Sequence, residues 1–251
     1  MGTITLLTDF GLSGTFVGAM KGVIQTIAPG ATVVDLTHDI APHDIVHGSY
    51  LWRTTVGYFP PVTVHVGVVD PGVGTLRRAI AVQLGSQFFV CPDNGLITDV
   101  LGEREPDAVV EIAPGRYTLP TISRTFHGRD IFAPAAAHLS AGARLTDLGP
   151  RVDDVVRLPR TQGGTIRHFD RFGNAWTDID AAWAAAAGAD TVVVREHALP
   201  IAQTYADVAP GQALAIAGSH GMLEIAVNCG SARDLLSLSM GLPVTVRTKA
   251  Q

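Results

Sequence analysis

The sequence predicts an α/β domain followed by a smaller, mainly β domain. Over the first 150 residues, short apolar runs rich in β-branched residues alternate with amphipathic segments of helical length, which is the pattern of a sheet covered by helices. After Leu148-Gly149-Pro150 the alternation stops, and short strand-like runs separated by turn residues follow. We therefore expect an N-terminal domain over residues 1–150, a linker over 151–164, and a small barrel or sandwich over 165–251.

In the first domain, helix signals divide the chain. One amphipathic helix begins near Phe16 and ends at Pro29-Gly30, and a second follows Pro42-His43-Asp44 and ends before Tyr58-Phe59-Pro60-Pro61. The remaining expected elements are strands over Ile4–Leu7, Thr32–Leu36, Val66–Val69, Ala79–Gln83, Gln87–Val90 and Ala108–Ile112, and a short helix over Leu96–Leu101.

The last helix of this domain is expected over Ile131–Leu139. Asp130 suits its N-cap, because a carboxylate there can accept from the free backbone N–H groups, and Pro134 is tolerable only near the first turn. His127 then lies at the helix entrance, where the helix dipole favours a negative charge. Pairing with Asp130 is the simpler interpretation of His127 taken alone.

The second domain is expected to consist of short strands. They cover Thr165–Phe169, Ala175–Ile179, Thr191–Arg195, Gln212–Ala217, Met222–Val227 and Pro243–Val246, with a helical turn or two over Ala181–Ala187.

Composition limits the classes of partner. The chain has 251 residues, 47% of them apolar and 16% charged, which supports a substantial core. Its formal net charge is −5 and it contains no run of Lys or Arg, so binding to nucleic acid or to an anionic membrane is not expected.

Cysteine use and the N-terminal sequence bear on location. Cys91 and Cys229 are the only cysteines and lack metal-site spacing, so neither a disulfide framework nor a thiolate zinc site is expected, and a reducing cytoplasm fits. We expect no signal peptide, because no basic segment with a long apolar region follows Met1. No uninterrupted apolar run is long enough to cross a bilayer.

The stretch Val66–Arg78 carries the strongest candidate for a site in the first domain. An apolar run brings Asp70 to the end of a buried strand, a Pro-Gly-x-Gly turn reverses the chain, and Arg77 and Arg78 begin the next strand. Ligands of open α/β sheets bind beyond the carboxyl ends of strands, where Asp70 is expected and where Asp9 also follows a strand. An ordinary turn explains Asp-Pro-Gly equally well.

A metal site is a competing hypothesis. His43 and His47 stand four residues apart, which on a helix would place them on one face, and Asp39 is nearby. Capping of a helix start by Asp44 is the alternative that we favour.

Two turns of the second domain have unusual polar content. The corner Asp170–Trp176 combines a carboxylate, an amide and two aromatic rings, and Ser219-His220-Gly221 precedes a strand interrupted by Glu224. Tight turns account for the glycines, but flat aromatic faces beside amide groups also suit a purine base.

Taken together, these motifs resemble the S-adenosylmethionine hydroxide adenosyltransferases, a family related to the fluorinase and chlorinase that use the same substrate. The resemblance runs in order from residue 4 to about residue 235. The motifs that carry it are Leu7–Gly11, Val69–Arg78, Pro92–Gly95, Thr125–Phe132, Asp170–Asn174 and Ser219–Ala226.

The resemblance implies an N-terminal α/β, Rossmann-like domain, a C-terminal β-barrel, and a homotrimer whose active sites lie between the first domain of one subunit and the second of a neighbour. It implies hydrolysis of S-adenosyl-L-methionine to adenosine and L-methionine with no metal and no cofactor. The family's water-activating set matches Asp70, Arg77 and His127. As a hypothesis, His127 accepts or orients the proton of water, Arg77 stabilises developing hydroxide, and Asp70 fixes the arrangement.

The residues that match the family's substrate contacts come from both domains. They are Asp9 for the ribose hydroxyls, Asn174 and the turn after Val227 for adenine, Asp170 and Ser219 for the methionine end, and Phe172 and Trp176 as walls of the base and sugar. Glu224, in the matching strand, is a further candidate for substrate binding.

The sequence departs from the halogenating relatives at several positions. They resemble one another in a Tyr where Asp70 stands, and a carboxylate there would repel a halide. The fluorinase has Ser at the position of Gly128 and Arg at that of His220. The alternatives to a hydrolase of S-adenosylmethionine are a metal-dependent hydrolase built on Asp39, His43 and His47, and a non-catalytic sensor of adenosine or S-adenosylmethionine.

Overall fold

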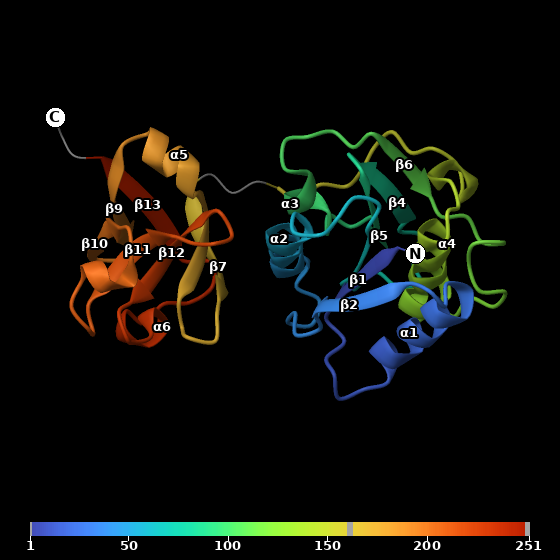
Figure 1. Cartoon of the computed structure of the whole chain (residues 1–251), viewed down its shortest axis with the longest axis horizontal. Helices are drawn as coiled ribbons and strands as arrows, with labels where there is room; N and C mark the ends of the chain where they lie inside the picture. The colour runs from blue at the N-terminus through green and yellow to red at the C-terminus, as the bar shows by residue number, and fades with distance from the viewer. Residues whose placement is uncertain (1, 160–162, 249–251) are drawn as a thin grey trace. The chain divides into compact units, whose positions relative to one another are not determined.

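A computed structural model describes residues 2–159 and 163–248 and divides the chain into two compact units, Met1–Leu158 and Pro159–Gln251 (Figure 1). Part of the expected linker, 160–162, and the end of the expected second domain, 249–251, lie outside the described residues. Within the described residues, no helix is both long and apolar enough to span a membrane.

The first unit is built on a six-stranded mixed sheet with the strand order β2-β1-β3-β5-β4-β6. Its strands are β1 (Thr3–Thr8), β2 (Thr32–Thr37), β3 (Val64–Val68), β4 (Ala79–Leu84), β5 (Gln87–Pro92) and β6 (Ala108–Glu111). The neighbours β2, β1, β3 and β5 run parallel, whereas β4 is antiparallel to both β5 and β6. Each strand that the sequence predicts in this domain is therefore present.

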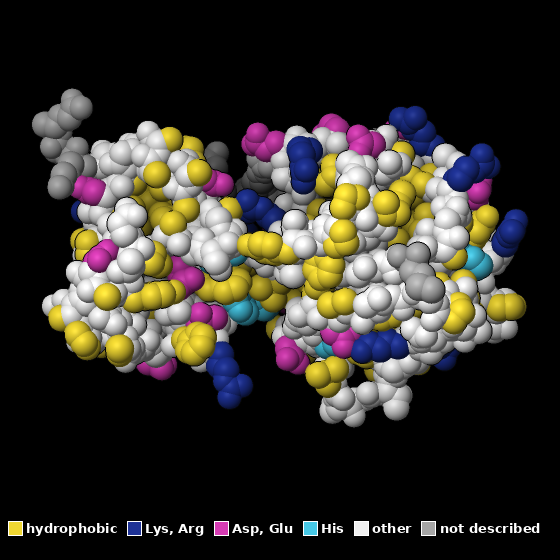
Figure 2. Space-filling view, in the orientation of Figure 1, with side chains coloured by type: hydrophobic (Ala, Val, Ile, Leu, Met, Phe, Trp, Pro, Cys, Tyr) yellow, Lys and Arg dark blue, Asp and Glu magenta, His cyan; other side chains and the backbone are white. Residues whose placement is uncertain are grey.

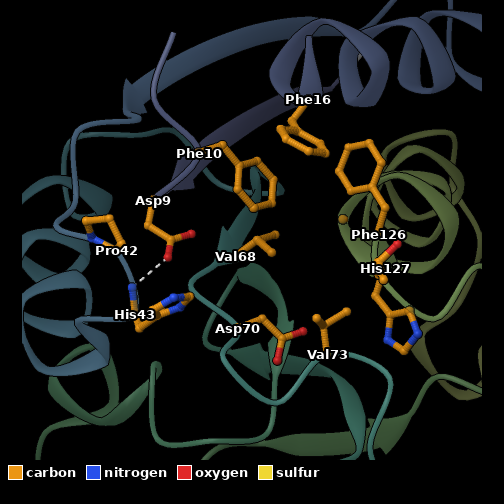
Figure 3. A pocket seen from close by; sticks show the side chains of 12 residues that line it. Asp9, Phe10, Phe16, Pro42, His43, Val68, Asp70, Val73, Phe126 and His127 are labelled. Atoms are coloured by element: carbon orange, nitrogen blue, oxygen red, sulfur yellow. Dashed lines mark hydrogen bonds between the residues drawn. The ribbon is translucent and has the colours of Figure 1, made fainter. Parts of the chain in front are cut away.

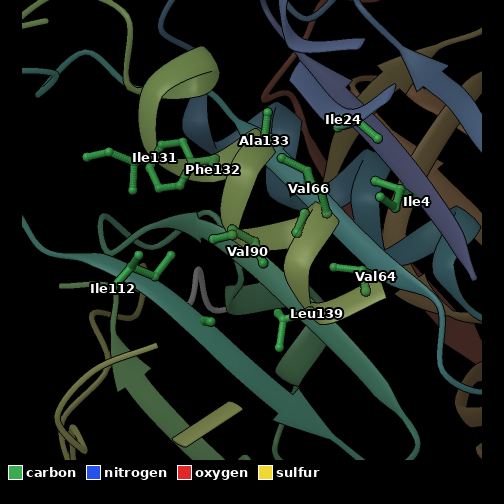
Figure 4. Close-up of a cluster of buried hydrophobic side chains, with 14 of the residues drawn as sticks. Ile4, Ile24, Val64, Val66, Val90, Ile112, Ile131, Phe132, Ala133 and Leu139 are labelled. Carbon is green, nitrogen blue, oxygen red and sulfur yellow. The ribbon is translucent and has the colours of Figure 1, made fainter. Parts of the chain in front are cut away.

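Helices cover both faces of this sheet. On one face, α1 (Phe16–Ile27) and α4 (Ala133–Ser140) pack against the strands through a fully buried apolar core that includes Ile24 and Val66 (Figure 4). On the other face lie α2 (Ile45–Val56) and α3 (Thr98–Leu101), where Trp52 packs edge-on against Phe89. The burial of strand side chains on both faces explains why these strands read as continuous apolar runs.

One detail of this unit differs from the sequence-based expectation. The α-helix predicted to start after Asp130 is preceded by a π-helical turn over Gly128–Phe132, so Asp130 lies inside the turn and is not an N-cap. Its side chain is fully buried and accepts from the backbone N–H of Ser123 instead. Pro134 does occupy the first turn of α4, as expected.

The segment after Pro150 packs against the first unit. The backbone N–H of Val152 donates to the carbonyl of Val109, and Val152 itself is buried in the core that contains α2 and α3. The guanidinium of Arg157 donates to the carbonyls of Gly102 and Arg104. Residues 151–158, which the sequence predicts as the start of a linker, therefore pack against the surface of the first unit. We call this segment the strap.

The second unit is a closed barrel with the strand order β10-β11-β12-β8-β7-β13-β9. Its strands are β7 (Gly164–Phe169), β8 (Ala175–Asp180), β9 (Ala189–Val194), β10 (His197–Ala202), β11 (Ala213–Ala217), β12 (Met222–Val227) and β13 (Pro243–Thr248), with the short helices α5 (Ala181–Ala186) and α6 (Ala232–Leu235). The barrel, and not the sandwich, is therefore the architecture of this unit.

Candidate active site

The candidate active site of the first unit lies where two neighbouring parallel strands end. Asp9 follows β1 and Asp70 follows β3, and these strands pair in register with Thr8 opposite Val68. Because the carboxyl ends of parallel strands meet at one edge, both carboxylates reach the same side of the sheet. The expectation that Asp70 faces a crevice beyond the strand ends is met.

A cavity of about 310 Å³ lies beside these two carboxylates. Its lining combines aromatic and aliphatic side chains with two carboxylates and two imidazoles (Figure 3). The lining residues are Asp9, Phe10, Phe16, Pro42, His43, Val68, Asp70, Val73, Thr125, Phe126, His127 and Gly128. This mixture of mostly apolar walls and a few polar groups is typical of a site for a small organic ligand.

Three side chains predicted to act together are in direct contact. The guanidinium of Arg77 donates through Nε to Asp70 Oδ1 at 2.9 Å, and its Nη2 lies 2.5 Å from Oδ2 of the same carboxylate. Nη2 also lies 2.6 Å from Nδ1 of His127. Arg77 therefore joins a carboxylate and an imidazole that both line the cavity, although the residues come from loops 50 positions apart.

The loop between Asp70 and Arg77 is held by its own turn. The N–H of Val73 donates to the carbonyl of Asp70, and the N–H of Thr75 donates to that of Gly72. Gly74 adopts a φ of +76°, and a Cβ on it would lie 2.2 Å from the carbonyl oxygen of Arg124. Only glycine allows both this conformation and this approach of the two loops.

The arginine next in sequence has a different role. Arg78 donates to Asp93 and to Asp154, and it thereby ties the strap to the turn after β5. In the same turn, Asn94 donates to the carbonyl of Val69, the residue before Asp70. Both arginines precede β4, which begins at Ala79, and do not begin the strand as expected; Arg77 contacts cavity residues and Arg78 contacts structural partners.

The environment of His127 keeps its imidazole neutral. Burial lowers its pKa below the ordinary 6.5, and the positive charge of Arg77 lowers the pKa further, against the opposing effect of Asp70. A guanidinium is a donor only, so the Nδ1 that meets it must be the unprotonated nitrogen of the ring. The proton of the neutral ring is then on Nε2.

Asp9 and His43 are linked on the opposite wall. The Oδ2 atom of Asp9 accepts from the backbone N–H of His43 at 2.8 Å, which leaves Oδ1 for a ligand (Figure 3). His43 has a φ of +69°, which is an uncommon conformation for a residue with a side chain. Its imidazole lies at the cavity between Asp9 and Asp70 (Figure 3).

The geometry does not support the metal hypothesis. His43 precedes α2, which begins at Ile45, so His43 and His47 do not share a helix face. Across residues 2–159 and 163–248, no group of three His, Cys, Asp or Glu side chains is arranged to hold a metal ion. The carboxylate of Asp44 accepts from the N–H of His47 and caps α2, in agreement with the capping interpretation.

In the second unit, the corner after β7 is organised by Asp170. Its Oδ1 accepts from the backbone N–H groups of Phe172 and Asn174, and its Oδ2 accepts from the side-chain amide of Asn174. Phe172 remains 75% exposed. Gly173, with a φ of +82°, leaves room for Ser231, so this corner packs against the turn that follows Val227.

A buried carboxyl group lies near the same corner. Glu224 of β12 pairs in register with Trp176 of β8, is nearly inaccessible, and accepts from the hydroxyl of Tyr205 at 2.8 Å. Burial raises the pKa of Glu224, and the charge of Asp170 raises it further. The ring of Trp176 stacks on the ring of His220, with 4.2 Å between the ring centroids. His220 follows Ser219 in the turn before β12.

Sequence reasoning missed several of these residues. Phe10, Phe16 and Phe126 form a cluster of rings 4.8 to 5.8 Å apart at the cavity, but Phe10 and Phe126 lie in loops and Phe16 is only the first residue of α1, so their spacing shows no common period. Tyr205 lies in a short turn before β11, and only Glu224, a charged residue within an apolar strand, could have signalled a buried partner.

The face shown in Figure 2 carries Lys and Arg side chains dispersed among acidic and neutral groups.

Comparison with known proteins gives a consistent result. The model of the SAM hydroxide adenosyltransferase N-terminal domain matches residues 4–149, and that of the C-terminal domain matches residues 164–245. The "(R)-S-adenosyl-L-methionine hydrolase" of Thermus thermophilus is 42% identical over 97% of this chain and 99% of its own length. A "Fluorinase" of Actinoplanes sp. is 28% identical over 98% of this chain and 97% of its own length.

A solved structure is similar throughout. The crystal structure of an uncharacterized conserved protein from Thermotoga maritima has a TM-score of 0.92 and 36% identity, and the match covers 97% of this chain and 99% of that one.

Proposed function

This chain belongs to the SAM hydroxide adenosyltransferase family, and from this premise we propose that it hydrolyses S-adenosyl-L-methionine to adenosine and L-methionine. The observation that carries the proposal is the contact of Arg77 with both Asp70 and His127 beside a nucleoside-sized cavity. The relative from Thermus thermophilus, whose name states a hydrolase of this substrate, supports it.

The reaction is a substitution at C5′ of the substrate. A water oxygen forms a bond to C5′ while the C5′–S bond breaks, and its electron pair returns to sulfur to give the neutral thioether of methionine. One water proton is released, so atoms and charge balance. Because the sulfonium is already a good leaving group, placing water in line behind C5′ supplies about 7 kcal/mol or more of the required lowering of the barrier.

The contacts favour separate roles for the three residues. Nδ1 of His127 is occupied by the guanidinium of Arg77, so His127 is better suited to orient Arg77 than to accept the proton. Arg77 in turn orients the carboxylate of Asp70 through two nitrogens. We assign Asp70 as the group that accepts the hydrogen of water, with Arg77 stabilising the negative charge that develops on the oxygen.

The substrate-binding residues of the proposal follow from the resemblance and from their chemistry. In the first unit, Oδ1 of Asp9 is available to accept from the ribose hydroxyls. The second-unit candidates are Asn174 and the turn after Val227 for adenine, Asp170, Ser219 and Glu224 for polar groups, and Phe172 and Trp176 for stacking. Asp70 also contacts the substrate, and its negative charge opposes a halide as nucleophile.

We also propose that the chain forms a homotrimer, in which the second unit of one subunit completes the cavity in the first unit of another. The proposal also includes a cytoplasmic location, which the two free cysteines support. The proposal assigns no cofactor, because the leaving group is part of the substrate and the guanidinium of Arg77 supplies positive charge.

The deciding experiment incubates the purified protein with S-adenosyl-L-methionine and follows adenosine and methionine by chromatography. Stoichiometric release of both products is expected, with full activity in EDTA. Tight binding without turnover would instead favour a sensor, and loss of activity in EDTA with recovery on adding zinc would favour a metal enzyme. Light scattering should give the mass of a trimer, and a fully active monomer would contradict the shared site.

A further inference from the structure

Asp130 is a charged residue that neither lines the cavity nor contacts Arg77, yet its side chain is fully buried within the site's second loop. Its Oδ2 accepts from the backbone N–H of Ser123 at 2.8 Å, and its Oδ1 accepts from Nε of Arg129 at 2.6 Å. These bonds lower the pKa of Asp130 against the effect of its burial, so the group is an ionised carboxylate. A buried charge is retained only where its partners are well placed.

These contacts close the loop on which His127 is carried. The bond from Ser123 to Asp130 spans seven residues, and the hydroxyl of Ser123 accepts from the N–H of Phe126 inside it. The backbone N–H of Asp130 donates to the carbonyl of Phe126. His127 is therefore enclosed between two turns that both depend on the segment closed by the Asp130 carboxylate.

The closed loop also contacts the other members of the site. The guanidinium of Arg129, held by Asp130, lies over the ring of Phe126, a cavity wall, at 5.1 Å. The carbonyl of Arg124 meets Gly74 in the loop that carries Asp70. A shift of the loop would thus change the 2.6 Å contact between Nδ1 of His127 and Nη2 of Arg77.

We propose that Asp130 is a positioning residue of this enzyme, which acts through the 123–130 loop to set the contact of His127 with Arg77. The kinetic part of this inference rests on the proposed hydrolysis of S-adenosylmethionine, whereas the structural part does not. A carboxylate is required at position 130 because one of its oxygens accepts from the backbone N–H of Ser123 while the other accepts from the guanidinium of Arg129. An amide of the same size can accept on one side only.

The test compares Asp130→Asn with Asp147→Asn. Asp147 forms a similar pair with Arg144, at 2.7 Å, and does not line the cavity. We expect kcat to fall about 10- to 100-fold in Asp130→Asn with KM within about threefold, because loss of a supporting partner displaces a catalytic group without removing it. The Asp147→Asn variant should keep the kcat of the unchanged protein.

A second readout uses no substrate. Imidazole nitrogen resonances of ¹⁵N-histidine protein, with His127 assigned from a His127→Gln sample, report which ring nitrogen carries the proton. The unchanged protein and Asp147→Asn should show the Nε2-protonated form of His127. In Asp130→Asn, the Nδ1 and Nε2 signals should move toward those of a tautomer mixture.

Three outcomes separate the hypotheses. A wild-type protein without turnover contradicts the proposed function, and the imidazole spectrum still decides the role of Asp130. Unchanged kcat and an unchanged His127 spectrum in folded Asp130→Asn overturn the inference. If Asp130→Asn does not fold, Arg129→Lys replaces it, since it keeps the charge but loses the planar fork: the inference requires a smaller fall in kcat, about 3- to 10-fold, and is overturned if kcat does not fall.

Discussion

The carboxylate of Asp70 is held by two nitrogens of one guanidinium: Nε of Arg77 lies 2.9 Å from Oδ1, and Nη2 lies 2.5 Å from Oδ2. Both side chains are largely buried, with 4% of Asp70 and 10% of Arg77 exposed. Such a paired contact fixes the plane of the carboxylate as well as its position. The contact therefore also fixes the direction of the lone pairs of Asp70 that do not face Arg77. Asp70 is one of the residues that line the cavity.

Replacing Asp70 by Asn should abolish most of the activity. The amide keeps the size of the side chain but places an NH2 group near a guanidinium and lacks the negative charge that lets the group take a proton from water. We expect kcat for adenosine release to fall at least about 100-fold, since a positioned proton acceptor contributes roughly 10²- to 10⁴-fold. A variant with kcat within threefold of the unchanged protein would exclude this role of Asp70.

Arg77→Lys and Arg78→Lys form a matched pair. Arg77→Lys keeps the charge but loses the fork that joins Asp70 to His127, so kcat should fall about 10-fold or more with little change in melting temperature. Arg78→Lys loosens the contacts with Asp93 and Asp154. It should lower the melting temperature and leave kcat nearly unchanged, and the reverse pattern would show that Arg78 is the arginine of the site.

Activity should fall on the acid side of neutrality. The pKa of His127 lies below its ordinary 6.5 because of burial and of Arg77, so the ring is neutral at pH 7 and gains a proton as the pH falls through that lowered pKa. Protonated Nδ1 would face a donor, and the contact with Arg77 would break. We expect kcat at saturating substrate to be constant above pH 6.5 and to fall below it; His127→Gln should lack this step.

The first unit should lose stability in acid through His65. This ring is fully buried, bonds to Thr5 and stacks on Phe89, and burial lowers its pKa to about 4. The contribution of the neutral His65 ring to the free energy of unfolding is therefore complete above pH 6.5. About 3 kcal/mol of it is lost as the pH falls toward 4. Urea unfolding between pH 7 and 4.5 should show this slope. If the free energy of unfolding of His65→Phe showed the same slope with pH, the slope could not be assigned to His65.

Gly74→Ala should be far more damaging than Gly85→Ala. Both glycines have positive φ, at +76° and +60°, so both substitutions carry a strain of about 1–2 kcal/mol. A Cβ at Gly85 meets nothing within 4 Å, whereas at Gly74 it would lie 2.2 Å from the carbonyl oxygen of Arg124. We expect only Gly74→Ala to lower kcat as well as the melting temperature. Equal effects on kcat would mean that the loops need not touch.

Regular elements were predictable because their physics is local. The strands of the first unit and the helices α1 and α2 followed from apolar periodicity and from the proline and glycine signals at their ends. β10 was missed because it contains Pro200, which usually marks a residue outside a strand interior. The π-helical turn at Gly128 was missed because Asp130 carries an N-cap residue type, and only its tertiary contact with Ser123 shows another use.

The site was predictable in part for the same reason. Asp9 and Asp70 follow strands, so their convergence could be expected from the sheet alone. The contact of Arg77 with His127 joins distant loops, and its expectation came from the resemblance to a family and not from spacing. The aromatic lining by Phe10, Phe16 and Phe126 has no sequence signal, because it depends on how two loops and the start of α1 meet in space.

The strap of residues 151–158 determines where this chain can be divided. A polypeptide truncated after Pro150 would leave the carbonyl of Val109 without the N–H of Val152 and would uncover apolar surface over α2 and α3. It would also remove Asp154 from Arg78, beside the arginine that reaches Asp70. An autonomous version of the N-terminal half therefore has to extend through Leu158, and a graft of the barrel onto another scaffold has to begin after it.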